Sequence, residues 1–133
     1  MGRKKSQEVN KMAQKRMISK SIVNSSPFLN LGRDAQILYI AATVSADDEG
    51  IVDIDPLINL LKMPAEQPLS ELLNCGLLVM LPKTGRKLVW IRDWETANHV
   101  QPSRFVESVY HDLKIEALKS LKEEFYGTAQ NDY

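Results

Sequence analysis

The sequence predicts a single α+β domain that is mainly helical and carries one small β-hairpin. Its 133 residues have the length of one domain, and a hydrophobic content of 44% is sufficient for one core. Apolar residues recur at helical spacing between residues 33 and 44, and two apolar runs flank a polar, glycine-containing turn between residues 77 and 91. The first pattern indicates a helix and the second indicates a hairpin.

Residues 1–16 are polar and basic, and we expect them to form a flexible arm. They contain almost no large apolar side chains, so burial cannot offset the entropy lost on ordering them. The folded part of the chain should begin at residue 17, because Ile18, Ile22 and Val23 introduce the first apolar spacing.

The stretch from residue 33 to residue 44 has the most regular helical pattern in the chain. Its apolar positions, which Tyr39 and Ile40 broaden, are Ala35, Ile37, Leu38, Ala41, Ala42 and Val44. The helix should stop before Ala46-Asp47-Asp48-Glu49-Gly50, whose acidic residues and glycine suit a turn. We refer to residues 46–50 as the acidic turn.

A very short strand and a second helix should follow the acidic turn. Residues 51–54 alternate in the manner of a strand. Asp55 then suits the N-cap position, and Pro56 the first helical position, of a helix that reaches Leu61. The strand and the helix are therefore expected in direct succession.

A third helix and a hairpin complete the pattern. Met63-Pro64 ends the preceding helix, and residues 66–75 form the next one, with Gly76 as its left-handed C-cap. Two helices joined by a tight turn are a helix-turn-helix candidate, and the hairpin of residues 77–81 and 87–91 would be its wing. Helix, short strand, helix, helix and hairpin is the order of a winged helix-turn-helix.

The predicted winged-helix domain spans residues 17–111, and residues 112–133 follow it as a C-terminal helix and tail. Between residues 112 and 125, apolar side chains recur at helical spacing among charged ones, which predicts an amphipathic helix. We expect residues 127–133 to be frayed.

Several separated blocks of the sequence resemble the amino-terminal domain of phage replisome organisers, which are DnaD-like replication initiation proteins. The blocks occur in the same order over about residues 16–112. They are residues 16–23, Phe28-Leu29, Ala35-Gln36, Leu38-Tyr39, Ala46-Asp47-Asp48 with Gly50, Gly76-Leu77-Leu78, residues 89–94, Asn98, and Arg104-Phe105 to Tyr110.

The resemblance implies a winged-helix domain that binds origin DNA or a nucleoprotein complex. It also implies self-association into a homo-oligomer and a role in helping a helicase or helicase loader reach the origin. Members of the family commonly continue into a further carboxy-terminal region. Because this chain stops at Tyr133, we expect it to be either a short member or an excised domain.

Basic residues concentrate near the amino terminus, although 17 basic against 17 acidic residues leave a formal net charge of zero. An arm rich in Lys and Arg gains affinity for DNA by releasing counterions, and cations around a hairpin turn can meet phosphates. The alternatives are a solubilising tail and an ordinary solvated turn. The candidate DNA-contacting residues are Arg3, Lys4, Lys5, Lys11, Lys15, Arg16, Lys20, Lys83, Arg86 and Lys87.

The second helix of the predicted helix-turn-helix is poorly suited to reading DNA. A helix in the major groove should present Arg, Lys, Asn and Gln to the base edges. Residues 65–75 instead offer Glu66, Gln67, Ser70, Glu71 and Asn74, with no basic residue. Carboxylates facing phosphates would repel them, so a structural helix packed on the hairpin is the favoured interpretation. Two rival functions are an assembly scaffold that binds protein rather than DNA, and a phage transcription regulator.

No motif indicates catalysis, a metal or a cofactor. We interpret Asp47-Asp48-Glu49 as a solvated turn, because consecutive residues of one loop rarely converge on one ion. His99 and His111 lie outside any metal-binding spacing, and Cys75 suits a buried thiol. The single cysteine, the lack of a secretory signal and the lack of a long apolar run predict a cytoplasmic protein with no membrane segment.

Overall fold

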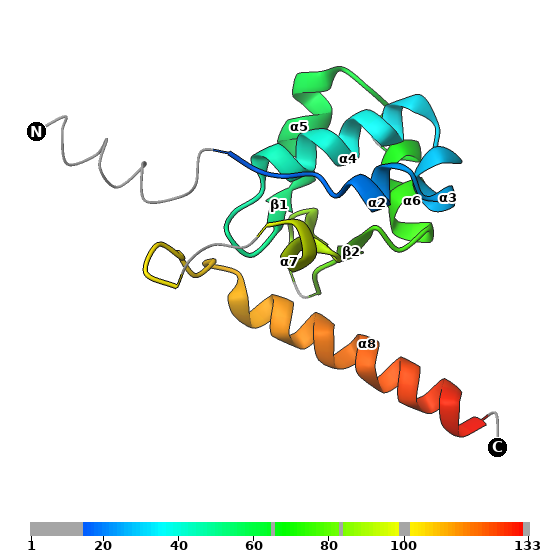
Figure 1. Cartoon of the computed structure of the whole chain (residues 1–133), viewed down its shortest axis with the longest axis vertical. Coiled ribbons are helices and arrows are strands. Elements are labelled where there is room, and N and C mark those ends of the chain that lie inside the picture. Colours follow the sequence, from blue (N-terminus) through cyan, green and yellow to red (C-terminus); the bar gives the residue numbers. More distant parts are fainter. Residues whose placement is uncertain (1–14, 65, 83, 99–101, 132–133) are drawn as a thin grey trace, which may run out of the picture.

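The computed structural model describes residues 15–64, 66–82, 84–98 and 102–131. Helices and a small antiparallel sheet of three strands make up the described part, which confirms the α+β class. The predicted arm lies outside the described residues except for its last two positions. In chain order (Figure 1), the elements are α2 (Lys20–Val23), α3 (Ser26–Leu29), α4 (Arg33–Ser45), β1 (Ile51–Asp53), α5 (Ile54–Leu61), α6 (Gln67–Asn74), β2 (Leu78–Met80), β3 (Leu88–Ile91), α7 (Trp94–Ala97) and α8 (His111–Asn131).

Strand β3 is the centre of the sheet, in the order β1-β3-β2, and both neighbours run antiparallel to it. Ile51 of β1 and Val79 of β2 are both paired with Trp90, whereas Val52 is paired with Val89. Because side chains alternate along a strand, the Trp90 row and the Val89 row point to opposite faces. All of β3 is buried, so both faces of the sheet are covered.

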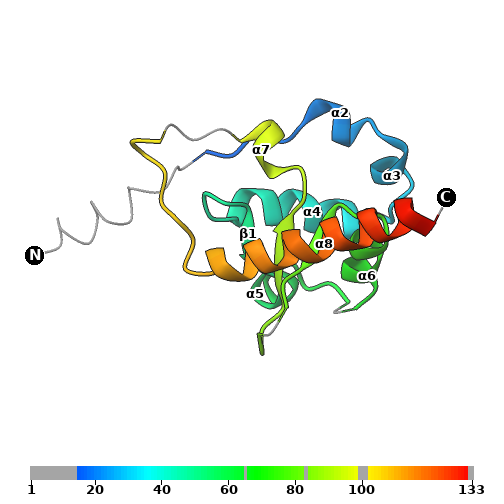
Figure 2. The ribbon, with the colours of Figure 1, turned by 90° about the horizontal axis from the view of Figure 1, so that it is seen from below.

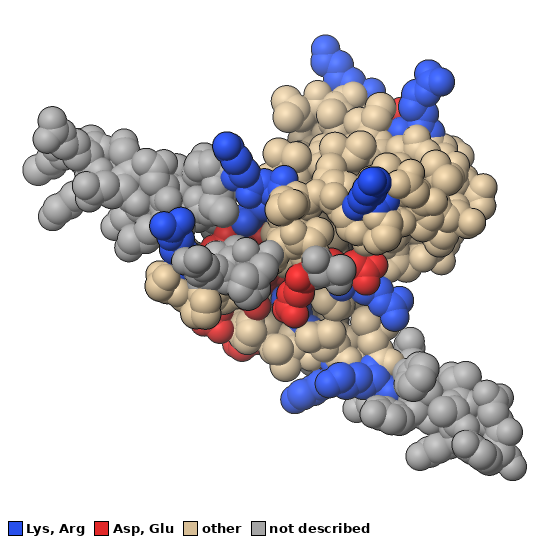
Figure 3. All heavy atoms as spheres, viewed as in Figure 1, with Lys and Arg blue, Asp and Glu red and all other residues tan. Residues whose placement is uncertain are grey.

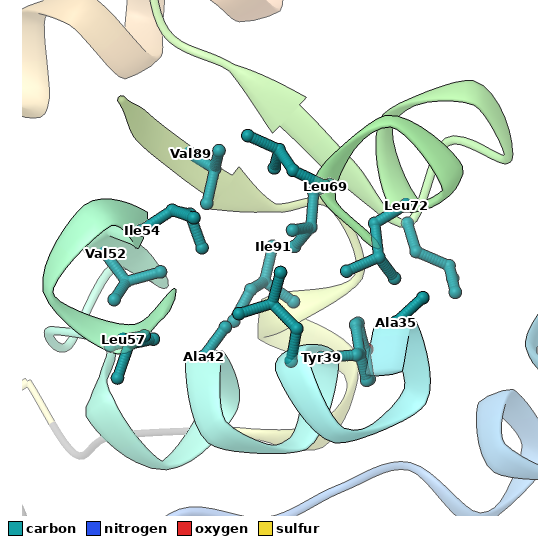
Figure 4. Packing of buried hydrophobic residues seen from close by; sticks show 14 of the residues in the cluster. Ala35, Tyr39, Ala42, Val52, Ile54, Leu57, Leu69, Leu72, Val89 and Ile91 are labelled. Carbon is teal, nitrogen blue, oxygen red and sulfur yellow. The ribbon is translucent and has the colours of Figure 1, made fainter. Parts of the chain in front are cut away.

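The Val89 face packs against α4, α5 and α6, where the larger core lies (Figure 4). Leu38 and Ala42 of α4, Ile54 of α5 and Leu72 of α6 are fully buried there. Ala35, Leu38 and Ala42 confirm one side of the predicted apolar stripe, whereas Ile37, Ile40 and Val44 of that stripe are exposed. This core joins the two predicted helices of the helix-turn-helix to the sheet.

The Trp90 face packs against α8, which lies on the opposite side of the sheet from α4 (Figures 1 and 2). Ala117 of α8 is buried with Ile51, Leu88 and Trp90 in a second, smaller cluster. We call this side of the sheet, with Ile51, Leu81, Leu88 and Trp90, the outer face. The amphipathic pattern predicted the helix but did not indicate which surface it would cover.

Two predicted boundaries are wrong. The α5 helix starts at Ile54, since Asp53 rather than Asp55 is its N-cap and accepts a hydrogen bond from the Asp55 amide at 3.4 Å. Helix α8 continues to Asn131 through the stretch expected to be frayed, because one glycine costs a helix only about 1 kcal/mol. By contrast, Gly76 has a φ of 81°, which confirms the predicted left-handed C-cap.

Candidate nucleic-acid interface and the acidic turn

The predicted DNA-contacting residues are placed very differently by the structure. Arg3, Lys4, Lys5, Lys11 and Lys83 lie outside the described residues. Lys15, Lys20 and Arg86 are exposed, Lys87 is partly exposed, and Arg16 has a buried side chain. In the view of Figure 3, the described Lys and Arg side chains are spread over the surface rather than gathered in one patch.

The tip of the β2–β3 hairpin keeps two cations within reach of solvent. The Thr84 hydroxyl accepts a hydrogen bond from the Arg86 amide at 3.1 Å, which orders the turn. The Arg86 guanidinium donates to the Tyr110 hydroxyl at 3.3 Å, and Lys87 Nζ lies 3.8 Å from Asp55 Oδ1. Exposed contacts of this kind contribute about 0–1 kcal/mol, so a phosphate can displace them.

Arg16 is buried in the folded domain, unlike the exposed cations that a DNA contact requires. Its Nη2 donates to Asp48 Oδ1 at 2.8 Å and to the Ala46 carbonyl at 3.0 Å, and its guanidinium lies 5.2 Å from the centre of the Trp94 ring. Only 3% of the side chain is exposed. Arg16 therefore belongs with the folded domain and not with the arm, because its charge is already neutralised by a buried carboxylate.

The acidic turn is buried, so its interpretation as a solvated turn is wrong. Asp48 and Glu49 are 2% and 4% exposed. Asp47 builds the turn, since its Oδ1 accepts from the Glu49 and Ile51 amides at 2.9 and 3.1 Å. Gly50 completes it with a φ of 82°. The turn thereby directs two adjacent carboxylates into the protein.

Asp48 holds the segment that enters the domain and the loop before α8. Besides the Arg16 ion pair on Oδ1, its Oδ2 accepts from the Val106 amide at 3.0 Å. Its backbone carbonyl accepts from Trp94 Nε1 at 2.9 Å. Nearby, Asn98 brackets Met17 with two hydrogen bonds, one to the amide and one to the carbonyl. These contacts close the amino-terminal segment over α7.

Glu49 holds the start of α8. Its Oε2 accepts from the Ser108 amide at 2.7 Å, and its Oε1 lies 2.5 Å from His111 Nδ1. Lys114 is 4% exposed, and its Nζ donates to the Glu49 carbonyl at 3.1 Å while lying 5.5 Å from the centre of the Trp90 ring. Glu49 therefore has two side-chain partners, the permanently charged Lys114 and the titratable His111.

The contact with Glu49 alters the titration of His111. The hydrogen bond to the Glu49 carboxylate raises the pKa of His111 above its ordinary value of 6.5, and burial acts in the opposite direction. The charges of Glu49, Glu107 and Asp112 add to the rise in that pKa. The imidazolium form is therefore favoured in the folded protein.

No pattern in the sequence singled out His111 or Lys114. The two residues are three apart at the start of a helix, which places them on one side of it, and this spacing was the only local signal. Their shared partner lies more than 60 positions earlier in the chain, as the separations of 62 and 65 residues show.

Helix α6 presents a polar surface without basic residues, as the sequence predicted. Gln67, Ser70 and Asn74 are exposed on it. Glu71 accepts a hydrogen bond from the Gly32 amide at 2.9 Å and so caps the start of α4. Its carboxylate therefore has a structural role between the two helices.

The described residues offer little for chemistry on a small molecule. A pocket of about 220 Å³ lies between the starts of α4 and α6, and ligand pockets usually have about 300–1,000 Å³. No group of His, Cys, Asp and Glu residues in the described part could hold a metal ion. Burial raises the pKa of Tyr39 to about 12, further from any physiological titration. None of the described helices has both the length and the apolar content to cross a membrane.

Comparison with known proteins gives no relative. No protein-family model, curated protein or solved structure matches the chain.

Proposed function

We propose that the chain forms a winged-helix domain that binds DNA in the replication-initiation machinery of a phage or prophage. The proposal includes no catalytic activity, cofactor or metal. It rests on the resemblance of the sequence blocks to replisome organisers and on the order of elements from α4 to β3. In the proposed fold, α5 and α6 are the helix-turn-helix, and the β2–β3 hairpin is the wing.

The observation that carries the proposal is the hairpin next to the helix pair. Strand β3 pairs with β1, which directly precedes α5, so the hairpin is fixed beside the two helices. Its tip presents Arg86 and Lys87, and their contacts with Tyr110 and Asp55 are weak enough for a phosphate to replace. A basic tip of this kind positions a protein on the DNA backbone without reading sequence.

The arm is the second proposed contact, and its membership is narrower than the sequence suggested. Arg3, Lys4, Lys5 and Lys11 remain candidates and lie outside the described residues. Lys15 of the arm and Lys20 of α2 are exposed and remain candidates as well, whereas Arg16 is buried. We assign helix α6 a structural role, because it carries no cation that could meet a phosphate and its Glu71 caps the start of α4. The proposed mode is therefore backbone binding by arm and wing.

Salt-dependent fluorescence anisotropy with labelled duplex and single-stranded DNA tests the proposal. We would compare the intact chain with a chain lacking residues 1–14 and with the double variant Arg86→Ala, Lys87→Ala. The truncation keeps Arg16, so that the buried ion pair is preserved. Removing one phosphate-binding cation should lower the slope of log affinity against log salt by about 0.9, hence by about 2 for the double variant.

The matched control is Lys119→Ala, Lys122→Ala, which removes two exposed cations from α8. It should leave the salt slope unchanged if the wing, and not overall charge, makes the contact. An intact chain that binds neither form of DNA at any salt concentration would contradict the proposal. If both double variants lose the same amount of affinity, the wing makes no specific contact with DNA, and the proposal would be limited to the arm.

We also propose a cytoplasmic location, self-association, and a helicase or helicase loader as the protein partner. Self-association and the protein partner rest on the resemblance, whereas the location rests on the single cysteine and the lack of a long apolar run. Co-purification of the chain with a replicative helicase or its loader, and measurement of its mass in solution by light scattering, would test them separately from DNA binding.

An assembly scaffold is the second candidate, and the outward side of α4 favours it. Ile37 and Ile40 are each 41% exposed and Val44 is 63% exposed, at positions that share one side of the helix. A helix with apolar residues on its solvent side is a docking surface for protein. Oligomers without DNA affinity would select this function. A transcription regulator would instead require one defined operator, and the side chains of α6 argue against it.

A further inference from the structure

Helix α8 covers the outer face of the sheet with an interface that contains two unfavourable features. Trp90 is 7% exposed, and its indole N–H has no hydrogen-bond partner among the described residues. Lys114 brings a charged ammonium group into the same buried region. The buried donor without an acceptor opposes burial, and the buried ammonium is compensated only because Glu49 and Glu95 are its partners. The apolar contacts of the second cluster oppose these costs, and the polar contacts where α8 begins add to that stabilisation.

Those contacts centre on His111, the first residue of α8, which lies between two carboxylates. Its Nδ1 is 2.5 Å from Glu49 Oε1 of the acidic turn, and its Nε2 is 3.5 Å from Glu107 Oε1 of the preceding loop. Asp112 adds a third negative charge next to it in the chain. Lys114 Nζ lies 3.8 Å from the same Glu49 Oε1 and 3.7 Å from Glu95 Oε1 of α7.

Both ring nitrogens of His111 face a carboxylate, which can only accept a hydrogen bond, so each nitrogen has to be a donor. A neutral imidazole has one donor and one acceptor nitrogen. If Nδ1 donates to Glu49, the lone pair of Nε2 faces the Glu107 carboxylate and repels it. Only the imidazolium offers a donor to both. The geometry is thus complementary to the protonated ring.

We propose that His111 is a proton-controlled latch that holds α8 on the outer face of the sheet, and that its deprotonation loosens α8 and uncovers Trp90. The proposal is independent of DNA binding. The larger core does not change when α8 loosens, since its residues on α4, α5 and α6 pack against the other face of the sheet. Loss of the latch should therefore move α8 without unfolding the domain.

The direction of the pH effect follows from the titration of His111. The pKa of His111 is raised when α8 is docked and returns towards 6.5 when it is not. The contribution of the imidazolium is complete below 6.5 and is lost as the pH rises through the raised pKa. Release of one proton allows the docking equilibrium to fall by at most about tenfold for each pH unit in that interval. Alkaline conditions should loosen α8, and mildly acidic conditions should hold it.

The two tryptophans of the chain provide separate reporters. In the Trp94→Phe variant, Trp90 reports the outer face; in the Trp90→Phe variant, Trp94 reports the amino-terminal segment. We would measure acrylamide quenching of each between about pH 5.5 and pH 9, a range that brackets the titration of histidine. Quenching of Trp90 should rise with a midpoint above 6.5, while Trp94 stays shielded throughout.

Two substitutions assign the transition. His111→Asn should abolish it, and His99→Asn, at the only other histidine of the chain, should leave its midpoint unchanged. If Trp94→Phe fails to fold, hydrogen exchange of the α8 amides in the unmodified chain replaces the quenching measurement. After correction for intrinsic rates, exchange should become faster over the same pH range. Quenching and exchange that do not change with pH would overturn the latch. An identical midpoint in His111→Asn would overturn it as well.

Discussion

Asp48 and Glu49 are adjacent carboxylates, both buried, yet they hold different parts of the chain with different cations. Asp48 is paired with Arg16, whose guanidinium is always charged, and it fixes the segment that enters the domain. Glu49 is paired with His111, whose charge depends on pH, and it fixes the start of α8. One turn can therefore provide a permanent attachment on one side and a conditional attachment on the other.

Breaking the permanent side should have the largest effect. Asp48→Asn keeps the shape of the side chain but leaves the Arg16 guanidinium buried without a counter-charge. We expect the free energy of unfolding to fall by about 3–5 kcal/mol. Urea denaturation followed by circular dichroism measures it. Asp55→Asn, which touches only the exposed Lys87, is the control and should change stability by less than about 0.5 kcal/mol.

Changing the backbone that presents both carboxylates should come next. A Cβ at Gly50 would lie 2.5 Å from Trp94 Cγ, and the residue has a φ of 82°. Gly50→Ala should therefore cost roughly 2–4 kcal/mol from the clash and the left-handed conformation together. At Gly85 an added Cβ meets no atom within 4 Å, so Gly85→Ala should be close to neutral in the same denaturation experiment. Equal losses of stability at the two glycines would show that the turn is more plastic than the structure indicates.

Removing the charge of Glu49 tests the pH-dependent attachment of α8 while the Asp48–Arg16 ion pair stays in place. Glu49→Gln takes away the carboxylate that His111 and Lys114 share, and we expect it to cost about 1–3 kcal/mol at neutral pH. The pKa of His111 should then fall back towards 6.5. The part of the stability that is normally lost as the pH rises above 6.5 should therefore disappear. Denaturation at several pH values checks this, and a retained pH dependence would assign it to a different group.

The smallest expected effect is at the outer carboxylate. Glu107 is 66% exposed, and its charge helps raise the pKa of His111. Glu107→Gln should lower the midpoint of the α8 transition by about 0.7 pH unit or less, since exposed ion pairs contribute about 1 kcal/mol or less. Titration of the His111 ring by proton NMR measures the shift. A shift as large as that in Glu49→Gln would mean that Glu107 is the main partner.

The sequence predicted the elements well where local patterns control them. The apolar spacing of Ala35, Leu38 and Ala42 indicated α4, and the two apolar runs around the glycine-containing turn indicated β2 and β3. The start of α5 was misplaced by two residues because Asp53 and Asp55 are both good N-caps, and only the geometry of the strand before them decided between the two.

The candidate site was predicted less well than the elements. Arg16 was grouped with the arm because it follows a run of cations, whereas its partner Asp48 lies 32 residues away. The acidic turn was taken as solvated because consecutive residues of one loop rarely converge on one ion, and nothing local indicates that Asp48 and Glu49 have distant cations as partners. The exposure of Arg86 at the hairpin tip agrees with the predicted position, and its proposed contact with DNA remains to be measured.

The sequence by itself determined that α4, α5, α6 and α8 become helices and that β1, β2 and β3 become strands, whereas the short helices α2, α3 and α7 were not predicted. It also determined that the left-handed position at the end of α6 is filled by glycine and that positive charge gathers near the amino terminus. These follow from periodicity and backbone preference, which act over a few residues. Only the tertiary structure decided that two acidic residues of a turn are buried, that Arg16 is an anchor, and that α8 covers Trp90. The reason is physical: the energy of a charge depends on which distant groups the fold brings beside it and on how much water the fold removes.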